Sequence, residues 1–283
     1  MSNIVTTDHK KPSFSSEKPG ILRITLNDWN QFYEVITNEI ATSSAYVWRG
    51  QGDSAWPMQS SFDRAMLQAG KEPSADLLKC HLENFKYAVR GRRGENPFDL
   101  KDDKDWWALG QHQGLKTPLL DWSESPFVAL YFAFSTILDP LEKIGRTRAV
   151  YALNKHLIGH TLRTINGERY DGPFVHPLVS DNPRLISQRG LFTMIPPGNN
   201  IKSWIKTTFS GHPISPPEEE NPDDESSSIE EQKFYLIEII IPDTGKNECL
   251  IALNRMNISH LTLFPDLSGA SEFCNQKLVL DEY

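Results

Sequence analysis

Residues 126–138 are almost wholly apolar, and this stretch predicts the central element of the fold. Its apolar side chains would cover nearly every face of a helix. They are Phe127, Val128, Leu130, Tyr131, Phe132, Phe134, Ile137 and Leu138. Ser125 followed by Pro126 is a favourable pair for the N-cap and the first turn of a helix. We therefore expect a buried helix that begins near Pro126.

The remaining pattern mixes strands and helices. Short apolar or β-branched runs predict strands at residues 21–26, 46–49, 119–120, 149–153, 190–195, 234–241 and 261–264. Apolar positions at helical spacing predict helices at residues 29–40, 76–90, 105–113 and 248–256. Residues 1–20 are expected to be disordered, and residues 154–183 mostly loop. Since no strict βαβ repeat appears, we expect a single α+β domain from residue 21 to residue 283, built on one main mixed or antiparallel sheet.

Polar side chains collect where the predicted strand at residues 119–120 leads into the central helix. Asp121, Ser123 and the first free N–H groups of that helix would lie close together, an arrangement that suits an anionic ligand. A helix over residues 105–113 would deliver His112 to the same place. We predict that Arg49, His112, Asp121 and Ser123 converge on one cleft.

Cysteine content and hydropathy exclude several classes of protein. The three cysteines, Cys80, Cys249 and Cys274, are odd in number and form no C-x-x-C pair, which argues against a disulfide framework and a zinc site. The first 25 residues contain no apolar signal region, and no apolar run reaches the roughly 18 residues that span a membrane. We expect a cytoplasmic protein without a metal and without membrane association.

The net charge of −8 comes from one segment. Eight acidic residues and no lysine or arginine lie between Lys206 and Lys233, and the rest of the chain has 29 acidic and 29 basic residues. With its prolines and serines, the part at residues 212–232 is expected to be a flexible loop. The overall charge therefore does not exclude an anionic ligand near Arg49, Arg184 and Arg189.

Several motifs together carry a family resemblance. They are Trp48-Arg49-Gly50-Gln51, Gln111-His112 with Gly114, Leu119-Leu120-Asp121-Trp122-Ser123, Ser125-Pro126 with Ala129-Leu130-Tyr131-Phe132-Ala133, Gln188-Arg189-Gly190-Leu191-Phe192, and Leu263-Phe264-Pro265-Asp266-Leu267 with Gly269. From about residue 45 to 275 the chain resembles the FRG-domain family, which is named for an aromatic-Arg-Gly motif. Trp48 stands where the family usually has Phe or Tyr.

The order of these motifs is also similar to that of arginine-type ADP-ribosyltransferases, and this resemblance implies a related fold and NAD as cofactor. Arg49 would hold the pyrophosphate, Ser123 would orient the nicotinamide ribose, and a late carboxylate would stabilise an oxocarbenium-like centre. The chain departs from that pattern at Asp121-Trp122-Ser123, where the transferases have Ser-Thr-Ser. It also lacks their Glu-x-Glu outside the acidic segment, which leaves Glu238, Asp266 and Glu272 as late acids.

The candidate site residues divide into two groups. The candidates for catalysis are His112, Ser123, Glu238 and Asp266. The candidates for ligand binding are Arg49, Gly50, Gln51, Gln111, Asp121, Trp122, Arg184 and Gln188. Several also have purely structural interpretations: an ion pair of Arg49 with Asp121, a helix-end histidine at His112, a core aromatic at Trp122, and a turn or cap at Asp266.

Two classes of function follow from these residues. In the first, the chain is a bacterial or phage-conflict enzyme that transfers ADP-ribose from a nicotinamide dinucleotide to a protein or nucleic acid, or hydrolyses the glycosidic bond. In the second, the same pocket belongs to a nucleotide-sensing or interaction module without chemistry. A carboxylate beside the ribose would favour the enzyme.

Overall fold

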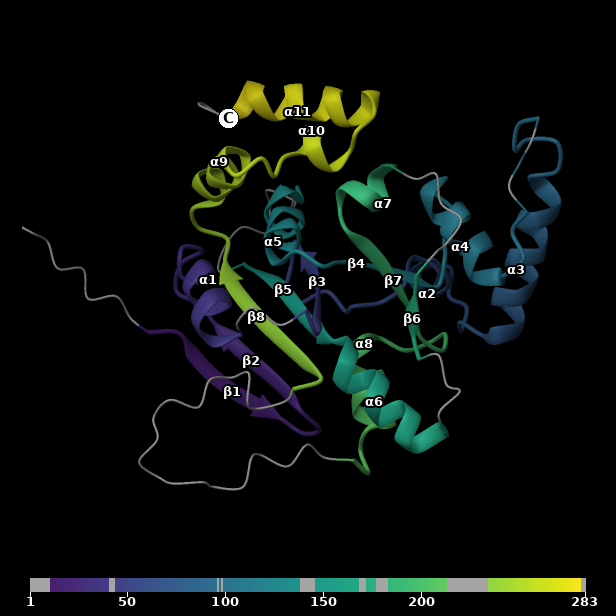
Figure 1. Ribbon diagram of the computed structural model, residues 1–283, viewed down its shortest axis with the longest axis horizontal. Helices are drawn as coiled ribbons and strands as arrows, with labels where there is room; N and C mark the ends of the chain where they lie inside the picture. The colour runs from purple at the N-terminus through teal and green to yellow at the C-terminus, as the bar shows by residue number, and fades with distance from the viewer. Residues whose placement is uncertain are drawn as a thin grey trace, which may run out of the picture.

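The structure is a computed structural model that describes residues 11–40, 44–95, 97, 99–137, 146–167, 172–176, 183–212 and 234–280. An eight-stranded sheet runs through it in the order β1-β2-β8-β5-β3-β4-β7-β6 (Figure 1). The strands are β1 Ser13–Glu17, β2 Ile21–Thr25, β3 Tyr46–Gln51, β4 Leu119–Ser123, β5 Thr147–Asn154, β6 Phe174–Val175, β7 Gly190–Met194 and β8 Leu236–Pro242. Neighbouring strands pair antiparallel except β2 and β8, which are parallel. The expected α+β fold with one mixed sheet is confirmed.

Helices cover both faces of this sheet. They are α1 Gln31–Glu34, continued by the π-helical turn η1 Val35–Glu39, α2 Ser61–Gln68, α3 Ala75–Ala88, α4 Asp103–His112, α5 Pro126–Ser135, α6 Lys155–Asn166, α7 Pro183–Ser187, α8 Ile201–Thr208, α9 Lys246–Arg255, α10 His260–Leu263 and α11 Leu267–Val279. The core on one face joins the sheet to α1, α5 and α9, and the core on the other face joins it to α6 and α8. A smaller cluster packs α3 and α4 against β4 and β7.

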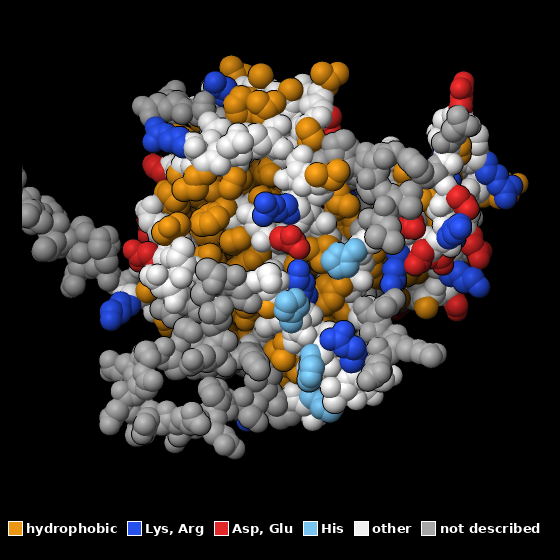
Figure 2. All heavy atoms as spheres, in the orientation of Figure 1, with side chains coloured by type: hydrophobic (Ala, Val, Ile, Leu, Met, Phe, Trp, Pro, Cys, Tyr) orange, Lys and Arg blue, Asp and Glu red, His pale blue; other side chains and the backbone are white. Residues whose placement is uncertain are grey.

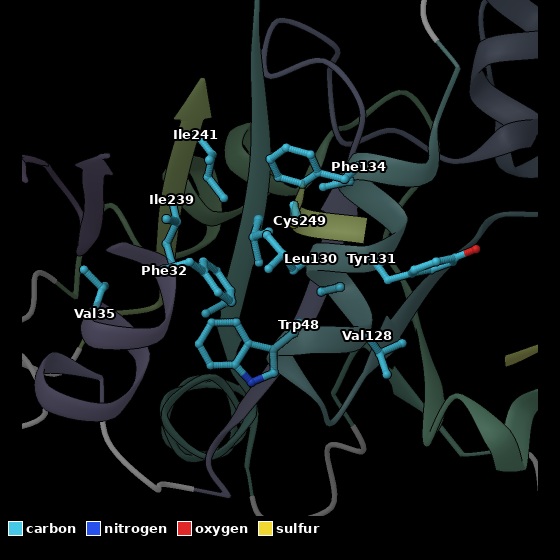
Figure 3. Close-up of a cluster of buried hydrophobic side chains, with 14 of the residues drawn as sticks. Phe32, Val35, Trp48, Val128, Leu130, Tyr131, Phe134, Ile239, Ile241 and Cys249 are labelled. Atoms are coloured by element: carbon cyan, nitrogen blue, oxygen red, sulfur yellow. The ribbon is translucent and has the colours of Figure 1, made fainter. Parts of the chain in front are cut away.

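Helix α5 is the buried centre of the first face, as the apolar pattern predicts. Figure 3 shows its side chains among those of the sheet and of the neighbouring helices, with Leu130 and Phe134 among them. The helix begins where Ser125 and Pro126 predict, because the Ser125 hydroxyl accepts the backbone N–H of Val128. Burial raises the pKa of the adjacent Cys249 thiol to about 12, which leaves it an inert core residue.

A glycine allows β3 to approach α5 closely. A Cβ placed on Gly50 would lie 1.8 Å from the carbonyl oxygen of Ala129 and 2.6 Å from the backbone nitrogen of Ala133. Those contacts are with helix backbone and cannot be relieved by a side-chain rotation. The glycine of the aromatic-Arg-Gly motif is therefore required by the packing of the central helix.

A buried arginine closes the far end of α5. The side chain of Arg148 on β5 is 1 % exposed and donates to the carbonyl oxygens of Ala133 and Thr136. It also donates to the carboxylate of Asp243. These bonds satisfy carbonyls that the helix leaves without an intrahelical partner, and they place a cation at the negative end of the helix dipole.

Several expectations differ from the structure, all of them at elements that depend on distant contacts. Residues 13–17, expected to be disordered, form β1 because β2 offers a free edge. Residues 155–166, expected to be loop, form α6, whose Ile158 and Leu162 are buried one turn apart despite Gly159. Residues 261–264, expected to form a strand, instead lie in the helical turn α10 and at its C-cap, Phe264.

Helices α2, α8 and α11 were not predicted from the pattern. Most of the predicted flexible loop at residues 212–232 lies outside the described residues. Within the described residues, no helix combines the length and the apolar character needed to cross a bilayer.

Helix α11 lies at the edge of the molecule and contributes little to the core. Of its residues only Gly269 is buried, while Leu267, Leu278 and Val279 are largely exposed. Figure 2 shows hydrophobic side chains along this upper edge, where Figure 1 places α11. Helix α11 is thus an outer layer of the molecule.

Candidate functional site

The sheet opens between β3 and β4, and a cavity of about 320 Å³ lies at the opening. In the described parts of these two strands, Trp48 and Ser123 are the single paired position. The strands line the cavity with Trp48, Arg49, Gly50, Asp121, Trp122 and Ser123. The segments above the sheet line it with Phe132, Thr136, Gln188 and Phe264. The cavity therefore forms where two strands stop making backbone hydrogen bonds to each other.

The guanidinium of Arg49 bridges the separated strands. Its Nη1 donates to the backbone carbonyl of Asp121 at 2.7 Å, in place of a backbone N–H of β3. Its Nε is buried and has no hydrogen-bond partner among the described residues. Burial lowers the pKa of Arg49, opposed by the nearby carboxylate of Asp121. An arginine keeps its charge under such conditions, so the cavity contains a cation with an unfilled donor.

Asp121 presents a carboxylate beside that cation. Its side chain is 62 % exposed, and its Oδ2 lies 3.8 Å from Nη1 of Arg49, too far for a hydrogen bond. Its Oδ1 accepts a hydrogen bond from Nε2 of Gln111 at 2.9 Å. The predicted convergence of Arg49 and Asp121 is confirmed by these distances.

Ser123 and Gln188 join β4 to the wall formed by α7 and α10. The hydroxyl of Ser123 donates to the carbonyl of Gln188 at 2.7 Å and accepts the backbone N–H of Ser125 at 3.0 Å. The side-chain amide of Gln188 donates to the carbonyl of Leu263 at 3.1 Å. Ser123 lies in the predicted cleft, but its hydroxyl already donates one hydrogen bond and accepts one within the protein. The N-cap of α5 is Ser125, as the sequence predicts.

Two aromatic side chains also line the cavity. Phe132 of α5 and Phe264, at the end of α10, meet edge to face with ring centroids 6.0 Å apart. The ring of His260 stacks on Phe264 at 4.1 Å, and its Nδ1 hydrogen-bonds the hydroxyl of Tyr131 at 3.1 Å. Burial lowers the pKa of His260 below its usual 6.5, which favours a neutral ring at pH 7. Phe264 is therefore a fixed wall of the cavity.

The predicted residues Arg184 and Asp266 fasten this wall and do not line the cavity. Nε of Arg184 donates to Oδ2 of Asp266 at 2.7 Å, and its Nη2 donates to the hydroxyl of Ser268 at 2.9 Å. Asp266 is also the N-cap of α11, since its Oδ1 accepts the N–H of Gly269. The cap role, which was one of its two sequence interpretations, is thus what the structure shows.

Glu238 lies in a different charged group, which we call the Glu238 cluster: Glu17, Arg23, Lys202, Lys206 and Glu238. The Glu238 side chain is 5 % exposed and receives Nε of Arg23 at 3.1 Å and Nζ of Lys202 at 3.0 Å. Lys202 also contacts Glu17, which in turn pairs with Lys206. The structure therefore separates this late acid from the cavity and surrounds it with cations.

The remaining predicted residues to be placed are His112, Gln51 and Trp122. His112 is the exposed last residue of α4 and does not line the cavity. Gln51 is buried, and its amide donates to the carbonyls of Asp53 and Trp56 in the following turn. Trp122 lines the cavity but is 2 % exposed, and its indole N–H donates to the hydroxyl of Thr193 at 2.9 Å. Its interpretation as a core aromatic with a partner is confirmed.

Three residues that line the cavity were not predicted as site residues, namely Phe132, Thr136 and Phe264. Phe132 and Phe264 belong to the quoted motifs, so their aromatic character was the available signal. Thr136 follows α5 and carried no signal, because its place in the cavity depends on the close approach of β3. Within the described residues, no group of three or more His, Cys, Asp or Glu is arranged to hold a metal ion.

Fold and cavity together define an α+β domain with an arginine-containing, aromatic-walled pocket at a split in its sheet. Residues 44–141 match the FRG domain, so an FRG domain is present, as the motifs indicated. The match includes the aromatic-Arg-Gly motif on β3, all of β4 and helix α5. The later segments of the resemblance, which contain Gln188 and Phe264, lie outside the matched residues. No curated protein and no solved structure matches the chain.

Proposed function

We propose that this FRG domain binds a nicotinamide dinucleotide in the cavity between β3 and β4, with Arg49 holding a phosphate. The observation that carries the proposal is the Arg49 guanidinium, which lines the cavity and has a buried Nε without an acceptor among the described residues. A buried donor without a partner costs free energy that a ligand oxygen can recover. Phosphate suits this group, because a planar guanidinium can donate to two of its oxygens.

The rest of the lining supports a ligand that combines phosphate with planar rings. Phe132 and Phe264 provide aromatic surface in the cavity that Arg49 also lines, and stacking a base on an aromatic side chain contributes about 1–3 kcal/mol. The volume of about 320 Å³ is at the small end of the range of ligand pockets, about 300–1,000 Å³. We expect one half of the dinucleotide to enter the cavity and the other half to extend beyond it.

Calorimetric titration with NAD tests this proposal. Arg49→Lys should weaken binding by about 1–3 kcal/mol, because an ammonium keeps the charge but loses the paired planar contact. Arg23→Lys is the matched control, since Arg23 belongs to the Glu238 cluster and does not line the cavity. Equal affinities of the wild type and Arg49→Lys would remove Arg49 from the site. A folded wild type that binds no NAD would contradict the proposal.

Cleavage of the bound dinucleotide is a second candidate function, and the exposed carboxylate of Asp121 in the cavity favours it. A carboxylate can stabilise the positive charge that develops on the ribose as the bond to nicotinamide breaks. Nicotinamide leaves with the bonding electron pair, and water or an acceptor group adds to the same carbon and loses its proton.

Release of nicotinamide and transfer of labelled ADP-ribose into a cell lysate measure this activity directly. Asp121→Asn should lower both signals. Binding of NAD without any release of nicotinamide by the wild type would assign the protein to the sensing class.

A further inference from the structure

The carboxylate of Asp121 is held in one orientation by two other side chains. The hydroxyl of Thr117, a residue that is fully buried, donates to Oε1 of Gln111. The same hydroxyl oxygen accepts the backbone N–H of Leu119 at 3.3 Å, so its proton is left for Gln111. The amide nitrogen of Gln111 must then face Asp121, and it donates to Oδ1 at 2.9 Å. We call this series of hydrogen bonds the Thr117–Gln111–Asp121 relay.

The relay leaves the second carboxylate oxygen available to a ligand. Oδ2 of Asp121 is 3.8 Å from Nη1 of Arg49, and no described residue donates a hydrogen bond to it. The side chain is 62 % exposed and lines the cavity. An acceptor of fixed orientation therefore lies beside a guanidinium whose Nε lacks an acceptor.

The positive charge of Arg49 determines which kind of hydrogen-bond donor Oδ2 of Asp121 would favour. A cation at Oδ2 would lie next to the Arg49 guanidinium, and like charges so close together repel each other. A neutral hydroxyl avoids that repulsion and can donate to the carboxylate. The ligand should therefore offer hydroxyl donors close to an anionic oxygen, which is the chemistry of a ribose that carries a phosphate.

We propose that Asp121 binds the ribose hydroxyls of the nucleotide half whose phosphate is held by Arg49, and that Gln111 is the positioning residue for this carboxylate. The inference rests on the proposed function, because the phosphate on Arg49 brings the ribose to Asp121. Asp121 then determines specificity for ribose over sugars without hydroxyls, and Arg49 supplies affinity for phosphate.

Calorimetry with single nucleotides tests the assignment. The probes are AMP and nicotinamide mononucleotide, each compared with its counterpart that lacks the 2′ and 3′ hydroxyls. For the half that enters the cavity, the wild type should prefer the hydroxyl-bearing form by about tenfold or more, as expected for hydrogen bonds to a charged group. Asp121→Ala should reduce that preference to about one, and Gln111→Ala should reduce it in part.

Controls separate this inference from the proposed function. Glu124→Ala removes an exposed carboxylate that pairs with Lys155, and it should keep the wild-type preference. Asp121→Asn, which preserves size and one oxygen acceptor, serves if Asp121→Ala does not fold, and it should also lower the preference. An unchanged preference in the Asp121 variants, with NAD binding intact, would overturn the inference and leave the proposed function standing. A wild type that binds neither NAD nor either half would overturn both.

Discussion

Two charged groups lie along one row of the sheet and differ in how completely they are satisfied. The strand register sets Arg49 opposite Tyr151, Tyr151 opposite Glu238, and Glu238 opposite Arg23. Both carboxylate oxygens of Glu238 lie within 3.2 Å of a cation. At the Arg49–Asp121 site, Nε lacks an acceptor and Oδ2 lacks a donor among the described residues.

This difference separates a structural ion network from a candidate binding site. Each carboxylate oxygen of Glu238 already has a cationic partner, whereas the Arg49–Asp121 pair keeps one donor and one acceptor that have no partner among the described residues. Residue type alone does not distinguish the two groups, since each combines arginine with a carboxylate. The following predictions test whether the distinction holds, beginning with the largest expected effect.

Gly50→Ala should disrupt both the Arg49–Asp121 site and the fold. Its Cβ would overlap the α5 backbone, so we expect a loss of about 3 kcal/mol or more of unfolding free energy. Gly159→Ala is the matched control, because nothing lies within 4 Å of its Cβ and alanine favours helix, with an expected gain of about 0.5–1 kcal/mol. Urea denaturation measures both. A Gly50→Ala protein as stable as the wild type would show that β3 and α5 do not need this close approach.

Glu238→Gln should break the closed network without affecting the open site. The neutral amide removes the anion that Arg23 and Lys202 share, although Lys202 keeps Glu17. We expect a loss of about 1–2 kcal/mol, less than for a fully buried pair because both cations are partly exposed. Glu124→Gln, in a more exposed pair with Lys155, should cost at most about 0.5 kcal/mol. Denaturation measures the stability of Glu238→Gln, and NAD titration measures its binding. If Glu238→Gln weakened NAD binding as much as Arg49→Lys does, the Glu238 cluster would not be separate from the binding site.

Asp266→Asn should have the smallest effect, and its difference from the wild type should shrink in acid. Hydrogen bonds from Ser268, from the Gly269 N–H and from Arg184 hold the pKa of Asp266 well below its usual 3.8. A lowered folded-state pKa stabilises the protein above the unfolded-state pKa, and this stabilisation is lost as the pH falls toward the folded-state pKa. Below about pH 4 the wild type should therefore lose stability more steeply than Asp266→Asn. Denaturation of both proteins between pH 2.5 and pH 6 would show this difference in unfolding free energy. Parallel stability curves would contradict the hydrogen bonds that Asp266 accepts from Arg184 and Ser268.

Local sequence determined the framework of the site. The apolar run with Ser125 and Pro126 specifies α5, and the aromatic-Arg-Gly motif falls on a strand as predicted. The expected nearness of Arg49 and Asp121 followed from polar residues at strand and helix ends. These features depend on side-chain periodicity and capping within a few residues, which a sequence displays directly.

Only the tertiary structure decided which candidates face the cavity. Glu238, Asp121 and Asp266 are all carboxylates near strand or helix ends in the sequence, but one lies in a closed ion network, one lines the cavity, and one caps α11. The roles of Phe264 and Thr117 likewise depend on contacts with segments far away in the chain or across a turn. Sheet order, the split between β3 and β4, and the satisfaction of each donor and acceptor arise from such non-local contacts, because hydrogen-bond partners are chosen by distance in space and not by separation along the chain.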